Sequence, residues 1–220
     1  MTIGQIVILV VTALIAFGVC QRVLDKMRLT DRQALFIALL LFIGGFLPNI
    51  SIGNVKINLG GAVVPFALSV YLLMKADTGY ERVRAIAASL SVAASVLALG
   101  RFFPNEPETM PFDINYLYGL VAGVIACLFA RSRRAAFIAG AMGVLLADIA
   151  EGAFVNLSGV SQTITLGGAG AMDVIVISGI VAVLLAEFVG ELLERMTRGT
   201  HRDESHEFVD GKFIERNRQK

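Results

Sequence analysis

The sequence predicts an all-α membrane protein with about seven transmembrane helices. Apolar residues make up 56% of the 220 residues, and the mean hydropathy is +0.73. Uncharged apolar segments recur along the chain, whereas charged residues lie between them and in the last 25 residues. Because no polar stretch is long enough to build a soluble core, we expect a transmembrane domain, 1–195, and a cytoplasmic charged tail, 196–220.

The seven predicted spans are about 3–22, 33–48, 60–74, 83–103, 114–130, 135–155 and 171–193. We expect the first to be retained rather than removed as an export signal, because no basic residue precedes it. In addition, Phe17-Gly18-Val19 lacks the small residues of a cleavage site. The third span is short, since its 15 residues make ~22 Å of helix, less than a hydrocarbon core of ~30 Å.

Basic residues predict the orientation of these spans. They concentrate in the first, third and fifth connections and after the last span: Arg22, Lys26, Arg28, Arg32, Lys75, Arg82, Arg84, Arg131, Arg133, Arg134, Arg195, Arg198 and Arg202. The opposite connections carry only Lys56 and Arg101. The positive-inside rule therefore predicts a multi-pass protein of the cell (inner or plasma) membrane, with the N-terminus outside and the C-terminus in the cytoplasm.

Two short segments on the predicted outer side are expected to form β-hairpins. Residues 51–58 place β-branched side chains around Gly53-Asn54, and residues 160–165 have a similar composition. Irregular backbone at membrane depth must be covered by protein or line a water-filled cavity. We therefore expect the two hairpins to cap or line such a cavity.

An internal repeat is predicted as well. Residues 32–38 return as residues 133–139, and each is followed by a span, a hairpin, a Leu-Gly-Gly-Ala motif (59–62 and 166–169) and another span. The expected order is three spans (about 3–75), one linking span (83–103) and three spans (about 114–193). A single linking span makes the halves parallel, and in transporters the binding site lies where such repeats meet.

Two aspartates interrupt the apolar sequence of the second half. Asp148 lies inside the sixth span, ~20 Å from its cytoplasmic start, and Asp173 opens the seventh span, nearer the outer surface by ~10 Å. A carboxylate in hydrocarbon costs at least ~2.5–3.5 kcal/mol, so it is seldom kept without a function. Asp148 and Asp173 are therefore the predicted catalytic residues.

Three functions remain open for this acidic pair. Two carboxylates that share a proton can activate water, which is the chemistry of an aspartyl-type peptidase cutting a transmembrane peptide. Alternatively, the acids bind a proton or a small cation in a transporter or channel. The third possibility is a non-catalytic membrane partner protein. The duplication favours transport, whereas the confinement of both acids to one half favours catalysis.

Each acid also has a structural explanation. Asp173 can cap the last helix, where free N–H groups and the helix dipole favour an acid. Asp148 can instead pair with a hydroxyl or with Arg101 at the outer end of the fourth span. Glu151, one turn after Asp148, is expected at the membrane interface.

Glycines precede the second acid and recur in the first half of the chain. Gly167, Gly168 and Gly170 permit close backbone approach, and the strand predicted at 160–165 offers an edge to an extended peptide. Tight helix packing is the structural alternative for these glycines. The predicted substrate-binding positions are Asn58, Gly60, Gly61, Pro65, Gly167, Gly168 and Gly170.

The motifs at 58–65, at Ala147-Asp148 and at 167–173 resemble a bacterial and archaeal membrane family known as domain of unknown function 1614. This resemblance covers most of residues 1–195. It implies a polytopic membrane protein and supplies no activity.

The two acids are also similar to those of intramembrane aspartyl proteases of the presenilin and signal-peptide-peptidase type. Those proteases place one Asp in a span and the other after a Gly-x-Gly-Asp turn, and this resemblance implies peptidase activity. Here Ala171-Met172 separates Gly168-Ala169-Gly170 from Asp173, so the acid comes two residues late. Residues 65–68 only partly match the Pro-Ala-Leu motif of those proteases. Lipoprotein signal peptidase is similar in its Gly-Gly-Ala motif and paired outer-side aspartates, again at different spacing.

The sequence contains no zinc, phosphate-loop or nucleic-acid motif, and we predict no metal and no cofactor. His201 and His206 belong to the charged tail and are expected to be solvated. The expected partners are the lipid bilayer and either a transmembrane peptide or a small cation or proton, with no nucleic acid.

Overall fold

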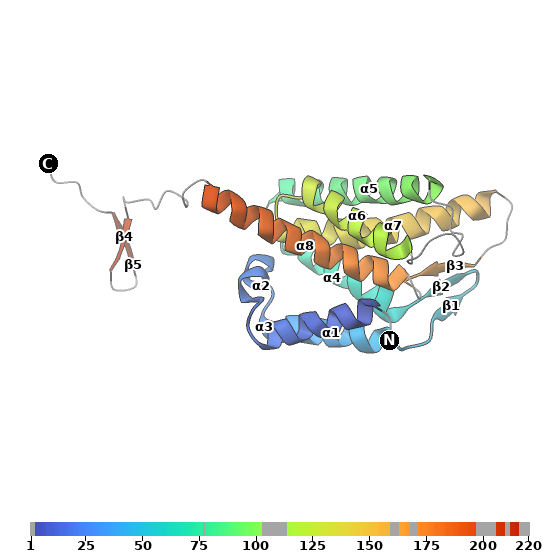
Figure 1. Cartoon of the computed structure of the whole chain (residues 1–220), viewed down its shortest axis with the longest axis horizontal. Helices are drawn as coiled ribbons and strands as arrows, with labels where there is room; N and C mark the ends of the chain where they lie inside the picture. The colour runs from blue at the N-terminus through green and yellow to red at the C-terminus, as the bar shows by residue number, and fades with distance from the viewer. Residues whose placement is uncertain are drawn as a thin grey trace. The chain divides into compact units, whose positions relative to one another are not determined.

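The computed structural model describes residues 3–76, 78–102, 114–158, 163–167, 171–196, 206–209 and 212–215. The described chain is mostly helical and forms two compact units, Met1–Ala186 and Glu187–Lys220 (Figure 1). Its helices are α1 Ile3–Ala16, α2 Gln21–Met27, α3 Asp31–Gly44, the π-helix η1 Leu59–Val63, α4 Val64–Met74, α5 Gly79–Phe102, α6 Ile114–Phe129, α7 Arg133–Leu157 and α8 Ala171–Met196. Its strands are β1 Ile50–Ile52, β2 Val55–Ile57, β3 Ile164–Leu166, β4 His206–Val209 and β5 Lys212–Glu215.

Local sequence signals explain where several helices begin. Thr30 and Gln33 form a capping box at the start of α3, in which each side chain binds the backbone N–H of the other. Ser132 caps α7 by accepting the backbone N–H of Ala135. Pro65 lies in the first turn of α4, where its fixed φ suits the helical backbone.

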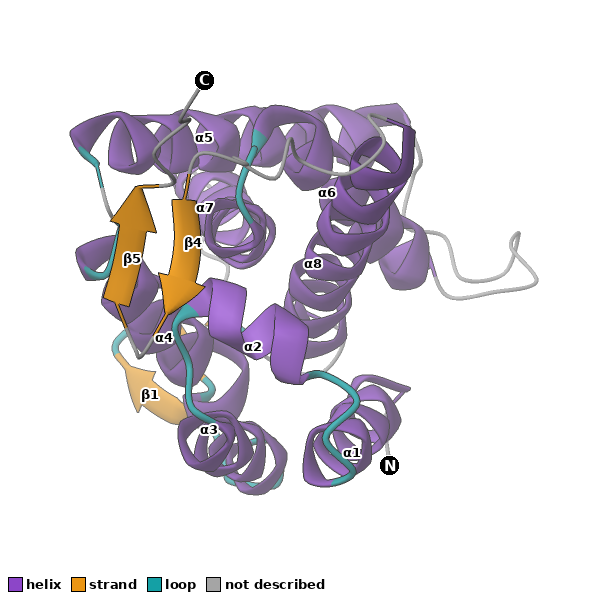
Figure 2. Ribbon diagram, turned by 90° about the vertical axis from the view of Figure 1, so that its left-hand side faces the viewer, coloured by secondary structure: helices purple, strands orange, loops and turns teal. Residues whose placement is uncertain are grey.

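The first predicted span, 3–22, is a broken helix. Gly18 has a φ of +74°, a left-handed conformation that suits glycine, and the chain turns by 98° between α1 and α2. Helix α1 therefore ends at Ala16, and α2 runs across the axis of α1 instead of continuing it (Figure 2).

Three described helices are long and apolar enough to cross a membrane: Gly79–Phe102, Arg133–Leu157 and Val174–Leu193. A fourth crossing is added if the bent pair α1–α2 counts as one span. Each of the other predicted spans contains a shorter helix, such as the 14 residues of α3. The chain is thus a helical, membrane-like protein, and the count of seven spans stays a prediction.

The packing of the first unit places small residues inside and large apolar residues outside. Fully buried side chains in the core include Ala122, Ala126, Ala136, Ala139 and Ala182. Large apolar side chains on the helix surfaces include Phe36, Phe66, Leu90, Leu128 and Leu184, each at least 50% exposed. Since lipid tails are as apolar as leucine, this distribution is typical of helices that pack through small residues within a bilayer.

Helix α7 is the centre of this packing, and it contacts α4, α5 and α6 (Figure 2). Glycines let neighbouring helices approach its backbone closely. A Cβ atom on Gly143 would lie 2.5 Å from Cβ of Val92 in α5, and one on Gly140 would lie 2.9 Å from the carbonyl oxygen of Ser178 in α8. Both positions therefore require glycine or a local separation of the helices.

The first predicted hairpin is present, and a third strand joins it. Strands β1 and β2 pair antiparallel around Gly53, whose φ is +60°, and β3 pairs with β2 in parallel, giving the order β1-β2-β3. The second hairpin was expected at 160–165, where residues 160–162 lie outside the described residues. The described part of this segment is a single strand whose backbone hydrogen bonds go to the first hairpin.

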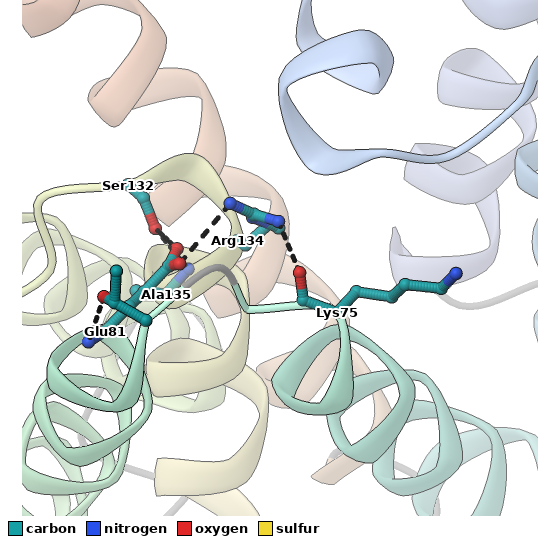
Figure 3. A network of polar contacts seen from close by, with 6 residues as sticks. Lys75, Glu81, Ser132, Arg134 and Ala135 are labelled. Carbon is teal, nitrogen blue, oxygen red and sulfur yellow. Dashed lines mark hydrogen bonds and ion pairs between the residues drawn. The ribbon is translucent and has the colours of Figure 1, made fainter.

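A polar network ties together two connections at the end of the first unit opposite the sheet (Figures 1 and 3). The Arg134 guanidinium donates to the Lys75 carbonyl oxygen at 2.7 Å and pairs with the Glu81 carboxylate at 3.4 Å. Ser132 donates its hydroxyl to the same carboxylate at 2.6 Å. The network gives partners to both terminal nitrogens of a largely buried guanidinium, and it fixes the start of α7 against α4 and α5.

The second unit contains a two-stranded antiparallel hairpin, β4–β5, in which Phe208 pairs with Phe213. Within the same unit Arg195 forms an exposed ion pair with Glu191, one helical turn earlier in α8.

Candidate functional site

Asp148 lies on α7 with its carboxylate turned toward the segment that follows β3. The carboxylate accepts a hydrogen bond from the backbone N–H of Gly167. Its Oδ2 atom is buried and has no hydrogen-bond partner among the described residues. An acceptor with an unused lone pair away from water is costly, so this oxygen is a candidate for binding a proton or a ligand. Glu151 is exposed one turn further along and is close enough to repel Asp148 when both are charged.

Gly167 brings two glycine motifs into direct contact. Its φ is +62°, and a Cβ atom on it would lie 2.3 Å from the carbonyl carbon of Gly61 and 2.4 Å from the nitrogen of Ala62. No other residue type fits without moving backbone, because both the conformation and the space exclude a side chain. The turn that donates to Asp148 is therefore supported from behind by η1.

Asn58 connects this turn to the rest of the sheet end. Its side-chain oxygen accepts the backbone N–H of Gly61 at 2.8 Å, which caps η1, and its side-chain nitrogen donates to Asn49 Oδ1 at 3.0 Å. Its backbone N–H donates to the Leu166 carbonyl oxygen at 3.0 Å. The backbone and side chain of one buried asparagine thus hold η1, the end of β3 and the segment before β1 in a fixed relation.

A second close approach supports η1 from the side of α3. A Cβ atom on Gly60 would lie 2.4 Å from the carbonyl carbon of Gly44, and one on Gly44 would lie 2.5 Å from Cα of Gly60. Pro65 is buried in the next turn. Four of the predicted substrate-binding positions, Asn58, Gly60, Gly61 and Pro65, therefore lie buried around η1, where they shape the backbone beneath the site.

Strand β3 runs beside the acid-bearing part of α7. A Cβ atom on Gly152 would lie 2.5 Å from the Ile164 side chain, so Ile164 packs onto the helix one turn beyond Asp148. Within the described residues β3 has one strand neighbour, β2, and its other edge has none. The exposed residues Thr163 and Thr165 flank Ile164.

The structure brings together Asp148, which was predicted to be catalytic, with Gly167, Gly61 and Asn58, which were predicted to bind substrate. Asp173 lies in the first turn of α8, and its side chain, like Gly168 and Gly170, lies outside the described residues. Arg101 is exposed at the end of α5. In the described part of the chain, no group of three His, Cys, Asp or Glu side chains is arranged to hold a metal ion.

Sequence reasoning missed Asn49 and Gly44. Asn49 follows Leu47-Pro48, and its role as a partner of Asn58 depends on a hairpin between them that returns the chain. Gly44-Gly45 lies within the predicted span 33–48, near its end, and this glycine pair was a usable signal of close backbone packing.

A family model described as "Protein of unknown function (DUF1614)" matches residues 10–185. No curated protein and no solved structure matches the chain. The matched range contains α7, the sheet β1-β2-β3 and both Leu-Gly-Gly-Ala motifs.

Proposed function

The chain belongs to the DUF1614 family, whose function is unknown, and we propose that it is an aspartyl-type intramembrane peptidase that uses Asp148 and Asp173. The observation that carries the proposal is the Asp148 carboxylate. It is fixed by the Gly167 N–H, and its buried second oxygen has no partner among the described residues. The next helix along the chain after Gly167 is α8, and Asp173 lies in its first turn.

The backbone contact between α7 and α8 supports a similar depth for the two acids. The helices run in opposite directions and meet where Gly140 touches the Ser178 carbonyl (Figure 1). Asp148 follows Gly140 by eight residues, ~12 Å, and Asp173 precedes Ser178 by five, ~8 Å, toward the same end. The positions then differ by only ~4 Å along the axes. This is less than the ~10 Å expected from counting each span separately.

The proposed reaction uses one ionised and one protonated carboxyl group. The carboxylate takes a proton from a water molecule, whose oxygen attacks the scissile carbonyl carbon while the protonated acid donates its proton to the carbonyl oxygen. In the collapse of the tetrahedral intermediate, the C–N bond breaks and the amine leaves with a proton from the acid that had taken one from water. The other carboxylate takes back a proton from one of the two hydroxyl groups, which leaves a carboxylic acid product and restores the starting protonation state. Two nearby carboxylates share a proton because their negative charges repel one another.

One edge of β3 has no strand neighbour among the described residues, and this edge supports a peptide as the substrate. A transmembrane helix must be unwound before its peptide bond can be attacked, and an extended segment loses its internal hydrogen bonds. A strand edge replaces those hydrogen bonds by β-addition, in which alternate backbone groups pair with the added chain. Since β3 lies along α7 beside Asp148, a segment added to this edge would pass close to the acid.

The test is cleavage by the full-length protein in vesicles of a mixture of single-span peptides, with products identified by mass spectrometry. The parent and the control Asp25→Asn, at an exposed acid on α2, should give the same products. Asp148→Asn and Asp173→Asn should each remove them. Cleavage that persists in Asp148→Asn, or that no variant alters, would overturn the proposal.

A proton- or cation-coupled transporter is the second candidate. The parallel pairing of β2 with β3 favours it, because this pairing joins the two motif-bearing segments of the predicted repeat at the acidic site. The same vesicles, loaded with a pH-sensitive dye, distinguish the candidates. Ion-dependent proton flux that is lost in Asp148→Asn, without any peptide cleavage, would establish transport instead. Absence of both activities would favour the non-catalytic partner.

A further inference from the structure

The end of the first unit opposite the sheet carries an excess of exposed cations. Among the described residues they come from the α1–α2–α3 connection and from the starts of α5 and α7: Arg22, Arg28, Arg32, Lys75, Arg82 and Arg131. The exposed acids that accompany them in the described residues are Asp25 and Asp31. We call the six cations the basic rim. Their spread over three connections creates a positive face that no single connection would provide.

The bend between α1 and α2 places apolar side chains next to this rim. Phe17 and Val19, on the turn, are 84% and 68% exposed, whereas Leu24 and Met27 of α2 are buried in the core. Helix α2 lies across the end of the helices with its buried side toward them (Figure 2). A helix that crosses the bundle end, with exposed apolar and basic side chains together, matches the interface of a bilayer, where apolar groups enter and cations remain at headgroup level.

Arg28 is held in a conformation that arginine seldom adopts. Its φ of +57° makes it the single non-glycine residue with positive φ among the described residues, at the position that ends α2. Glycine or asparagine usually occupies such a helix-ending position, because a Cβ atom is unfavourable there. The chain therefore keeps an exposed cation at the end of α2, at a position where glycine would fit the backbone better.

We propose that the basic rim and α2 form a binding surface for the headgroups of anionic phospholipids. Phosphate oxygens have the charge and the hydrogen-bonding capacity that guanidinium groups match, and clusters of four to eight cations beside a membrane span are typical of such sites. Phe17 and Val19 enter the acyl boundary beside the headgroups. This inference is independent of the peptidase proposal and concerns the opposite end of the unit.

The experiment measures thermal unfolding of the purified full-length protein in neutral detergent with added phosphatidylglycerol or phosphatidylcholine. Phosphatidylglycerol should raise the Tm more than phosphatidylcholine does, and high salt should remove the difference because screening weakens the attraction. The triple variant Arg22→Gln, Arg28→Gln, Arg32→Gln should lose most of the difference in Tm between the two lipids. We expect the affinity for phosphatidylglycerol to fall about fivefold for each cation removed. The matched control is Lys56→Gln with Arg101→Gln, two exposed cations at the sheet end, which should respond as the parent does.

Arg28→Gly separates lipid binding from damage to the fold. Glycine suits the left-handed conformation, and the Tm of this variant in phosphatidylcholine serves as its own reference, relative to which the rise with phosphatidylglycerol should shrink. Inorganic phosphate, added to give the same concentration of negative charge as phosphatidylglycerol, should leave the Tm unchanged. Equal responses to both lipids, a full response in the triple variant, or an equal shift with phosphate would each overturn the proposal.

Discussion

Single residues at the sheet end are constrained by backbone contacts more than by side-chain packing. Asp148 accepts its hydrogen bond from Gly167, and Gly167 in turn touches Gly61, so the position of the carboxylate depends on two residues without side chains. The sequence revealed both glycines as members of repeated motifs. It could not reveal that they touch, because the contact joins segments from different halves of the chain.

Gly167→Ala should destabilise the fold and displace the turn that holds Asp148. An alanine at positive φ costs about 1–2 kcal/mol, and its Cβ overlaps the backbone of Gly61, so we expect a total loss above ~3 kcal/mol. Gly53→Ala is the matched control. It has the same left-handed conformation, with nothing within 4 Å of the added Cβ, and should lose only about 1–2 kcal/mol. Thermal unfolding in detergent measures the stability of both variants. Equal losses of stability would contradict the contact between Gly167 and Gly61.

The sequence indicated a role for Asp148 more clearly than for Asp173. Asp148 was recognisable because a charge within an apolar run has few explanations. Its partner in the described residues, a backbone N–H, has no sequence signal at all. For Asp173 the sequence offered a helix cap and a catalytic role, and these two interpretations still stand side by side.

At the scale of elements, the apolar pattern predicted where the helices lie, but it did not predict where a helix breaks. Each predicted span contains a helix, whereas the first one stops at Ala16 and turns at Gly18. An isolated glycine inside an apolar segment is common, so its left-handed conformation could not be read from the sequence. The parallel β3 was missed for a related reason, since two similar strand segments predict two hairpins as readily as one shared sheet.

The junction between α5 and α7 should depend on the Glu81–Arg134 ion pair. The two side chains are 16% and 8% exposed, so Arg134→Gln leaves a largely buried carboxylate without its charge partner and should cost roughly 3 kcal/mol. Arg195→Gln breaks the exposed pair with Glu191, where the guanidinium side chain is 76% exposed, and should cost less than ~1 kcal/mol. The free energy of unfolding of both variants is measured by chemical denaturation. Similar losses in the two variants would show that burial of the Glu81–Arg134 pair does not increase its contribution.

At the scale of the whole molecule, hydropathy alone could predict the class of protein. The small-inside, large-outside packing gives that prediction a structural basis, since Ala136 and Ala139 are fully buried whereas Leu90 is 57% exposed. The number of crossings is harder to predict, because α3 and α4 are shorter than a bilayer core and their apolar composition suits both a short span and a buried helix.

The predicted orientation can be tested with single cysteines at opposite ends of the first unit. Lys56→Cys and Arg82→Cys, both exposed, are introduced after Cys20 and Cys127 have been replaced by serine. If the N-terminus is outside, a membrane-impermeant thiol reagent should label position 56 in intact cells and position 82 only after permeabilisation. The reverse pattern would invert the topology, and labelling of both positions in intact cells would contradict a spanning arrangement.

The parallel pairing of β2 with β3 also constrains how the protein is made. Ile57 pairs with Leu166, so the first hairpin leaves the ribosome long before its partner strand has been synthesised. At ~5–20 residues per second this delay is on the order of 5–20 s, during which one edge of β2 remains open. Strand β3 can close that edge only after α7 is in place. Completion of the sheet is therefore a late step of biogenesis, and it forms the Gly167 turn and the Asp148 site at the same moment.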